Sequence, residues 1–148
     1  MRAFKLYTSL SAKYEGFASW VDSVFDPEVT ARLPFKLDEK EELRVLGVGT
    51  GSGEMDSNML NSLLRRYPRI NNRVVEPSEE QICKYKALAQ SKAHELQGVK
   101  FDWRQQTVDQ YRDDTDGDGA KFHIVDVMQS IYYADDVDSS LMYLYDLV

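Results

Sequence analysis

The stretch "LRVLGVGTGSGEMD" at residues 43–56 decides the fold. It begins as a short apolar run typical of a β-strand, passes through alternating glycines, and continues with apolar residues at helical spacing: Met55, Met59, Leu60 and Leu63. Glycine is favoured where the backbone turns sharply or approaches another group closely. The stretch therefore predicts a strand, a glycine turn and a helix, with a ligand or another chain segment close to the glycine backbone.

The spacing of the glycines excludes two phosphate-binding motifs. The phosphate loop GxxxxGK[ST] needs a lysine, and none lies between Arg44 and Lys84. The dinucleotide fingerprint GxGxxG needs a glycine five residues after its first, and no glycine of this stretch meets that spacing. What is present is GxGxG at residues 49–53, followed at once by Glu54. An acidic residue there repels phosphate and favours a ligand that carries positive charge.

A second acidic residue, Glu76, ends the strand predicted within "RVVEP" at residues 73–77. An acidic side chain at that place, a little over 20 residues past the glycines, suits hydrogen bonds to ribose hydroxyls. Positive charge, a ribose and no phosphate describe S-adenosylmethionine. A tight turn and a solvated glutamate would each explain one feature alone, but the combination favours the cofactor.

Strand and helix patterns alternate along the chain. We predict strands in 43–48, 73–76, 99–103 and around 122–127, and helices in 54–66, 78–96 and from Asp138 onward, with "DDTDGDG" at 113–119 as a loop. Ser78 and Gln81 form a capping box. The alternation predicts an α/β domain with a parallel, doubly wound, Rossmann-like sheet and helices on both faces, over residues 43–148. Residues 1–42 form an N-terminal helical cap.

Apolar spacing also predicts which side chains of the helices face inward. The first predicted helix buries Tyr14, Phe17, Ala18 and Val21, with Trp20 and Val24 widening that face. A new helix is expected to begin at Asp26, as its cap, and Pro27. The helix after Ser78 turns Ile82, Tyr85, Ala89, Ala93 and Leu96 inward, and Cys83 is expected to be a small packing residue.

The last residues, 138–148, read as an amphipathic helix without a closing signal. A sheet of four strands would leave an open edge and an uncovered face. We therefore expect a fragment, truncated after the fourth strand and the following helix. We expect it to be marginally stable and aggregation-prone, and expect the longer parent protein rather than these 148 residues alone to carry the activity.

Bulk composition narrows the function classes. The 148 residues carry a formal net charge of -7, which argues against a partner held through nucleic-acid phosphates. No apolar run reaches the ~18 residues of a membrane span. One cysteine and no Cys/His cluster predict neither a disulfide nor a metal site. "DDTDGDG" imitates half a calcium loop, but position twelve, Val125, is not a glutamate. A cytoplasmic monomer without a membrane or nucleic-acid partner is expected.

Four segments together carry a family resemblance. They are "VLGVGTGSGEMD" at 45–56, "YPRINNRVVEPSEEQICKYKAL" at 67–88, "VKFDW" at 99–103 and "VMQSIYY" at 127–133. They resemble the histamine N-methyltransferases, which are class I S-adenosylmethionine-dependent enzymes, and the similarity runs from about residue 13 to 147. The resemblance implies a class I methyltransferase sheet.

The resemblance also implies roles for residues. Positions expected to contact the cofactor are Gly49, Gly51, Gly53, Glu76, Gln81, Thr107, Val108 and Met128. Val108 stands where the family has a serine, so a hydroxyl contact would fall to Thr107. Gln129 matches a glutamine near the substrate imidazole. An acidic substrate contact maps to Asp26 or Glu28; spacing does not decide between them, and the capping role of Asp26 favours Glu28.

The implied function is N-methylation of a small imidazole amine, with histamine as the favoured acceptor. A neutral imidazole nitrogen has a free lone pair, so the enzyme mainly supplies position, and no catalytic residue is assigned. Tyr132 and Tyr133 could line the site of the methyl donor, although packing in the hydrophobic core is the simpler role for each. The alternatives are a catalytically silent methyltransferase-like binding module and a methyltransferase for another small amine.

Overall fold

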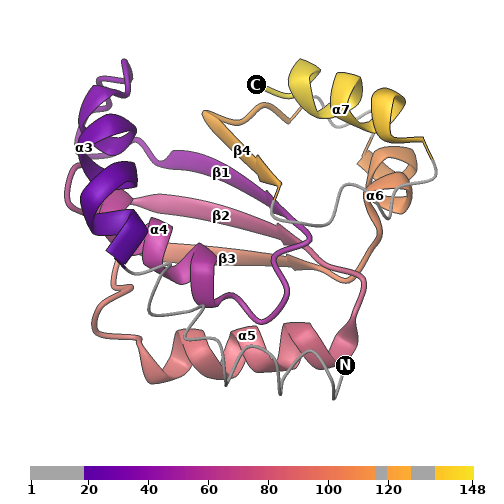
Figure 1. Ribbon diagram of the computed structural model, residues 1–148, viewed down its shortest axis with the longest axis horizontal. Helices are drawn as coiled ribbons and strands as arrows, with labels where there is room; N and C mark the ends of the chain where they lie inside the picture. Colours follow the sequence, from indigo (N-terminus) through magenta and orange to yellow (C-terminus); the bar gives the residue numbers. More distant parts are fainter. Residues whose placement is uncertain (1–18, 116–119, 128–135) are drawn as a thin grey trace.

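The computed structural model describes residues 19–115, 120–127 and 136–148. Its centre is a sheet of four strands, shown in Figure 1: β1 (Leu43–Val48), β2 (Ile70–Val75), β3 (Val99–Arg104) and β4 (Ile124–Val127). The strand order is β3-β2-β1-β4, and every neighbouring pair is parallel. The predicted parallel α/β sheet is therefore confirmed.

Helices cover both faces of this sheet (Figure 1). One face, here the α4/α5 face, carries α4 (Glu54–Leu64) and α5 (Glu79–Ser91); the other, the α6/α7 face, carries α6 (Val108–Thr115) and α7 (Val137–Asp146). A short helical segment precedes the sheet and packs against α4: η1 (Val21–Phe25), α3 (Asp26–Glu28) and η2 (Thr30–Arg32). In the part of the chain that the structure describes, no helix is long and apolar enough to cross a membrane.

Strand β1 explains why there are two cores. Side chains alternate along a strand, so Leu43 and Val45 enter the core of the α4/α5 face while Leu46 and Val48 enter that of the α6/α7 face. All four are buried, because a parallel strand in mid-sheet is covered on both sides. The unbroken apolar run that predicted this strand follows from that double burial.

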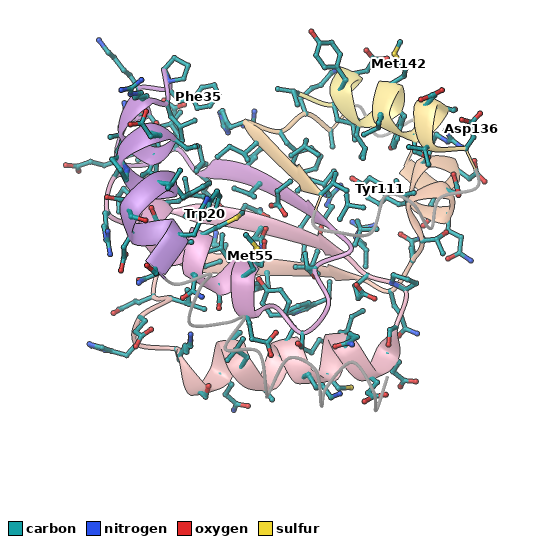
Figure 2. All side chains as sticks on the ribbon, viewed as in Figure 1. Trp20, Phe35, Met55, Tyr111, Asp136 and Met142 are labelled. Atoms are coloured by element: carbon teal, nitrogen blue, oxygen red, sulfur yellow. The ribbon has the colours of Figure 1, made fainter. Side chains whose placement is uncertain are left out.

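Helix α6 was not predicted. Its first turn is a capping box: the Gln110 N–H donates to Thr107 Oγ1 at 3.1 Å, and the Thr107 N–H donates to Gln110 Oε1 at 2.9 Å. The T-x-x-Q signal was present in the sequence, but most side chains of the segment are polar. Tyr111 anchors α6 to the core: its side chain is buried and points from α6 toward the strands (Figure 2).

Several predictions about the helices were wrong. Trp20 and Val24 are exposed rather than part of the buried face, and Phe25 is buried instead; Tyr14, Phe17 and Ala18 lie outside the described residues. Asp26 is not a cap, because the helical backbone continues through Phe25 and no side-chain cap bond forms. The cap of α7 is Asp136, which accepts from the Ser139 N–H at 3.1 Å, not Asp138.

Two predictions on α5 were also wrong. The helix ends at Ser91, so Ala93 falls in the following turn and is exposed, whereas Leu96 in that turn is buried. Cys83 is exposed and does not pack in the core. The inward positions Ile82 and Tyr85 are confirmed.

Candidate functional site

The carboxyl edge of the sheet gathers most of the expected cofactor residues. Because all strands are parallel, Gly49, Glu76 and Thr107 follow the carboxyl ends of β1, β2 and β3 at one edge. The chain passes from β1 to β2 on one side, while β4 lies on the other, and ligands of open α/β sheets bind at such a reversal of strand order. Met128 and Gln129 follow β4 in sequence and lie outside the described residues.

In the glycine loop, Gly49–Gly53, the N–H groups of the three glycines donate hydrogen bonds within the protein. Gly49, Gly51 and Gly53 have φ angles of 66°, 59° and 82°, which side-chain-bearing residues rarely adopt. Their N–H groups donate to the Val75 carbonyl at 2.8 Å, to Glu76 Oε2 at 3.0 Å and to the Thr50 carbonyl at 3.2 Å, respectively. A phosphate cradle needs such donors aimed at the ligand. The loop geometry thus agrees with the exclusion of phosphate ligands.

Glu76 is the side chain that holds this loop. It is 7% exposed; Oε2 accepts from the Gly51 N–H, and Oε1 accepts from the Ser78 N–H at 3.1 Å. A carboxylate oxygen can accept more than one hydrogen bond, so these contacts leave acceptor capacity for ribose hydroxyls. Sequence reasoning anticipated a ligand role for Glu76 but missed its loop-holding role.

The start of α5 lies directly beyond Glu76. Ser78 Oγ accepts from the Gln81 N–H at 3.3 Å, which confirms Ser78 as the cap. The Ser78 N–H, which a reciprocal capping box would pair with Gln81, donates to Glu76 instead. Gln81 is half-buried in the first turn of α5, beside the residues that hold the glycine loop.

Thr107 and Val108 divide their roles at the start of α6. Thr107 is exposed, and its hydroxyl oxygen caps the helix while its O–H can still donate to a ligand. Val108 is partly buried against the core of the α6/α7 face.

The structure does not bring Asp26 to the glycine loop. Asp26 Oδ1 accepts from the Ser62 hydroxyl at 2.6 Å, and Oδ2 pairs with Arg65 at 3.3 Å. Both partners lie toward the end of α4 remote from the loop; Ser62, the nearer of the two, is about 12 Å along the axis from Glu54 at 1.5 Å per residue. Glu28 lies in the same segment, exposed, and pairs with Arg32 at 3.2 Å.

Sequence reasoning missed a buried acidic cluster on the α4/α5 face near the loop. Its members come from four elements: Asp56 of α4, Asn72 of β2, Tyr85 of α5 and Asp126 of β4. Asp56 Oδ2 accepts from the Tyr85 hydroxyl and from Asn72 Nδ2, the latter at 3.2 Å. A signal existed: Asn72 and Asp126 are polar residues inside strands. No group of three or more potential metal-ligating His, Cys, Asp or Glu occurs among the described residues.

Burial governs protonation in this cluster. Burial raises the pKa of Asp56, and the hydrogen bonds from Tyr85 and Asn72 offset part of the rise. Burial, followed by the charge of Asp56, raises the pKa of Asp126 well above its usual value. Burial and the Asp56 carboxylate also raise the pKa of Tyr85, so its hydroxyl keeps its proton. Burial and an acidic neighbour thus together favour the neutral form of the Asp126 carboxyl group.

Comparison with known proteins gives relatives for nearly the whole chain. No family model matches it. Histamine N-methyltransferase of Cavia porcellus is 33% identical over 150 residues, which cover 99% of this chain and 50% of that protein. Carnosine N-methyltransferase 2 of Gallus gallus is 30% identical over 144 residues, covering 88% of this chain and 44% of that protein. The chain spans about half the length of the curated relatives it matches.

Solved structures agree on the fold. The plantazolicin methyltransferase BpumL, in complex with SAH, superposes on 99% of this chain and 48% of its own, with a TM-score of 0.63 at 14% identity. At that identity the likeness concerns the fold, and it matches the parallel sheet with helices on both faces. The chain is therefore a relative of the histamine N-methyltransferases, built on the Rossmann-like fold of class I methyltransferases.

Proposed function

We propose that the protein is an S-adenosylmethionine-dependent N-methyltransferase whose acceptor is a small imidazole amine, most simply histamine. The observation that carries the proposal is the glycine loop at the carboxyl edge, in which the N–H groups of the three glycines are bonded within the protein and Gly51 is held by the buried carboxylate of Glu76. Such a loop suits a ligand with hydroxyl donors and positive charge. The sequence relatives support the same cofactor.

The cofactor supplies a methyl group on a sulfonium, and this chain supplies the binding site for it. Glu76 accepts the ribose hydroxyls without releasing the loop. Gly49 and Gly51 allow close approach, and at Gly51 a Cβ would meet no atom within 4 Å, so that side of the loop is open. At Gly53 the ring of Tyr85 fills the corresponding space, so we propose a contact through the backbone there. Gln81, Thr107, Val108 and Met128 complete the proposed cofactor contacts.

The acceptor is inferred from shared chemistry. Histamine and carnosine, named in two of the relatives, both carry an imidazole ring. A neutral ring nitrogen attacks the methyl group with its own lone pair, so the protein needs to orient the ring and hold the amine. Residues 1–42 form the proposed substrate side, with Gln129 near the ring. Glu28 is the preferred amine contact, since its ion pair with Arg32 is exposed to solvent, whereas Asp26 is tied to α4 through both Ser62 and Arg65.

Methyl transfer to labelled product tests the proposal. The chain, and the same chain within a protein of its relatives' full length, are incubated with labelled S-adenosylmethionine and with histamine, carnosine and aliphatic amines; we expect the full-length form to methylate the imidazole compounds only. Glu76→Ala is expected to weaken cofactor binding at least tenfold, or about 1.4 kcal/mol, while Glu79→Ala, an exposed neighbour on α5, leaves it unchanged. Cofactor binding without methylation of any amine would favour the silent binding module. No binding at all would refute the proposal.

A second pair of variants separates the two acidic candidates. Glu28→Gln is expected to raise KM for histamine with an unchanged cofactor Kd, because a charge-assisted contact to the ammonium is lost. Asp26→Asn is expected to lower the melting temperature instead, through its bonds to α4. The reverse pattern would assign the substrate contact to Asp26. A cytoplasmic, monomeric state belongs to the same proposal, and size-exclusion chromatography of the chain tests the second part.

A further inference from the structure

The buried acidic cluster has more acceptors than donors. Asn72 and Tyr85 are fully buried, Asp56 is 2% exposed and Asp126 is 9% exposed. The two hydrogen bonds that reach a carboxyl group both go to one atom, Asp56 Oδ2, and Asn72 Nδ2 also donates to the Tyr85 hydroxyl at 3.4 Å. Within the described part of the chain, Asp56 Oδ1 and both oxygens of Asp126 accept none. Two ionised carboxylates in this setting would be strongly disfavoured.

Two of the unpartnered oxygens, Asp56 Oδ1 and Asp126 Oδ1, border one small space beside Gly47, where the Cβ of any other residue would lie. A Cβ on that residue would lie 3.4 Å from Asp56 Oδ1 and 3.6 Å from Asp126 Oδ1. It would also lie 2.8 Å from the Cγ2 of Thr50, so the glycine loop folds back over the same point. Gly47 and Asp126 are register partners in β1 and β4. The two carboxyl groups therefore border the same small space, which Thr50 of the loop also borders.

The titratable groups around this point are all acidic. They are Asp56 from α4, Asp126 from β4 and the hydroxyl of Tyr85 from α5; β1 and β2 contribute Gly47 and the uncharged Asn72. Among the described residues no Lys or Arg forms an ion pair with either carboxyl group. The glycine loop is flanked by two further acidic residues, Glu76, which accepts from Gly51, and Glu54 at the start of α4. With no cation to neutralise them, two such neighbours titrate as one unit.

We propose that Asp56 and Asp126 form a proton-sharing pair that senses the charge of the ligand on the glycine loop. The pair holds one proton while no cation occupies the loop, and it loses that proton when the sulfonium donor binds. The carboxyl O–H bond of Asp126 breaks, its electron pair stays on oxygen, and the proton passes to the buffer. This inference rests on the proposed cofactor site.

The consequence is discrimination between the methyl donor and its product. S-adenosylmethionine carries a sulfonium, whereas S-adenosylhomocysteine, left after methyl transfer, is a neutral thioether at the same sulfur. A doubly ionised pair of Asp56 and Asp126 attracts the positive charge of S-adenosylmethionine. It has no such charge to attract at the sulfur of S-adenosylhomocysteine. Proton uptake after transfer thus weakens the hold on the product. Asp56 and Asp126 act through charge and do not touch the reacting atoms, so they are positioning residues.

Calorimetric titration of the chain in phosphate and Tris buffers at pH 7 tests the linkage, because the buffers differ in ionisation enthalpy and so report the protons released. We expect release of up to about one proton per molecule of S-adenosylmethionine and less for S-adenosylhomocysteine. Asp126→Asn removes that difference, and Asp113→Asn, an exposed change on α6, keeps it. Equal release for the two ligands in the wild type would overturn the proposal. If Asp126→Asn does not fold, Asp56→Asn serves the same comparison.

Infrared spectroscopy of the ligand-free chain provides an independent measurement. At neutral pH the wild type is expected to show the carbonyl band of a protonated carboxyl group, and Asp126→Asn to lose it. Absence of that band would refute the shared proton whatever the ligands do. Failure of both ligands to bind would refute the proposed cofactor site and the ligand-linked release together, and the band would still decide whether the pair holds a proton.

Discussion

On the α6/α7 face of the sheet, Asp102 lies between two arginines; on the α4/α5 face, Asp126 lies against another aspartate. Asp102 Oδ2 accepts from Arg73 Nε at 2.8 Å, and Oδ1 accepts from Arg104 Nε at 3.0 Å. Burial pushes the pKa of Asp102 upward, but the bonds and charges of Arg104 and Arg73 outweigh it and leave that pKa below its usual value. Burial and a like charge move the pKa of Asp126 the other way.

The difference shows how one sheet can bury carboxyl groups for two purposes. A carboxylate between cations is ionised at every ordinary pH and links β2 to β3 as part of the scaffold. A carboxyl group beside another acid is held neutral, so its charge can change when a cation arrives nearby. Only the second arrangement lies beneath the glycine loop.

The largest expected effect comes from Gly53→Ala, which disturbs the α4/α5 face alone. A Cβ at Gly53 would lie 2.4 to 2.7 Å from three carbons of the Tyr85 ring, and φ is 82° there. Overpacking and backbone strain together are expected to cost about 3 kcal/mol in urea unfolding. Gly51→Ala shares the backbone strain but meets no atom within 4 Å, so about 1 kcal/mol is expected. Equal losses for the two variants would show that contact with Tyr85 does not matter.

Asp102→Asn is expected to destabilise the chain by about 2 kcal/mol at pH 7, because charge-assisted bonds on a partly exposed carboxylate are lost. The folded-state pKa of Asp102 is depressed, so its contribution is present above the unfolded pKa and disappears as pH falls through the folded pKa. The loss measured by urea unfolding is therefore expected to shrink in acid. A loss that stays constant with pH would contradict the role of the charge.

Asp126→Asn is expected to stabilise the chain, in contrast to Asp102→Asn, which destabilises it. Because the folded-state pKa of Asp126 is raised, its carboxyl group increasingly destabilises the fold as pH rises above the unfolded pKa. The variant is expected to be more stable than wild type at pH 8, by about 1 kcal/mol, the usual size for a single substitution, and close to equal to it at pH 4. Urea unfolding at both pH values measures the change. A gain independent of pH would indicate a packing effect.

The smallest expected effect concerns Thr107, at the start of α6. Thr107→Ala removes the acceptor for the Gln110 N–H and is expected to cost roughly 0.5 to 1 kcal/mol. Thr107→Ser keeps the hydroxyl and is expected to restore most of the loss. Thermal unfolding followed by circular dichroism compares the two, and similar melting temperatures for both variants would argue against the cap.

Much of the fold was predictable because it depends on local patterns. The apolar run 43–48, the alternating glycines and the Ser78 cap each carry their own signal within a few residues. Helix α6 escaped prediction because its side chains are mostly polar and its capping signal, Thr107 to Gln110, was overlooked. Trp20 and Val24 were misplaced because a helical repeat gives the spacing of a face but not its rotation toward the core.

The candidate site divides in the same way. Glu76 was found because its place after a strand is visible in sequence. The buried acidic cluster was missed because Asp56 and Asp126 are 70 positions apart and meet only once β1, β4 and α4 are assembled. Asp26, expected as a cap or a substrate contact, joins the N-terminal segment to α4 through Ser62, a contact that no local pattern encodes.

The hydrogen bonds within the glycine loop also bear on how fast ligands bind. With Gly49, Gly51 and Gly53 already bonded to Val75, Glu76 and Thr50, the loop needs no ordering step before an encounter becomes productive. We expect the backbone amide of Gly51 to exchange its hydrogen slowly in the free chain, and to exchange quickly in Glu76→Ala. Association would then be limited by diffusion and long-range attraction, and would slow as added salt screens the acidic surface around the site.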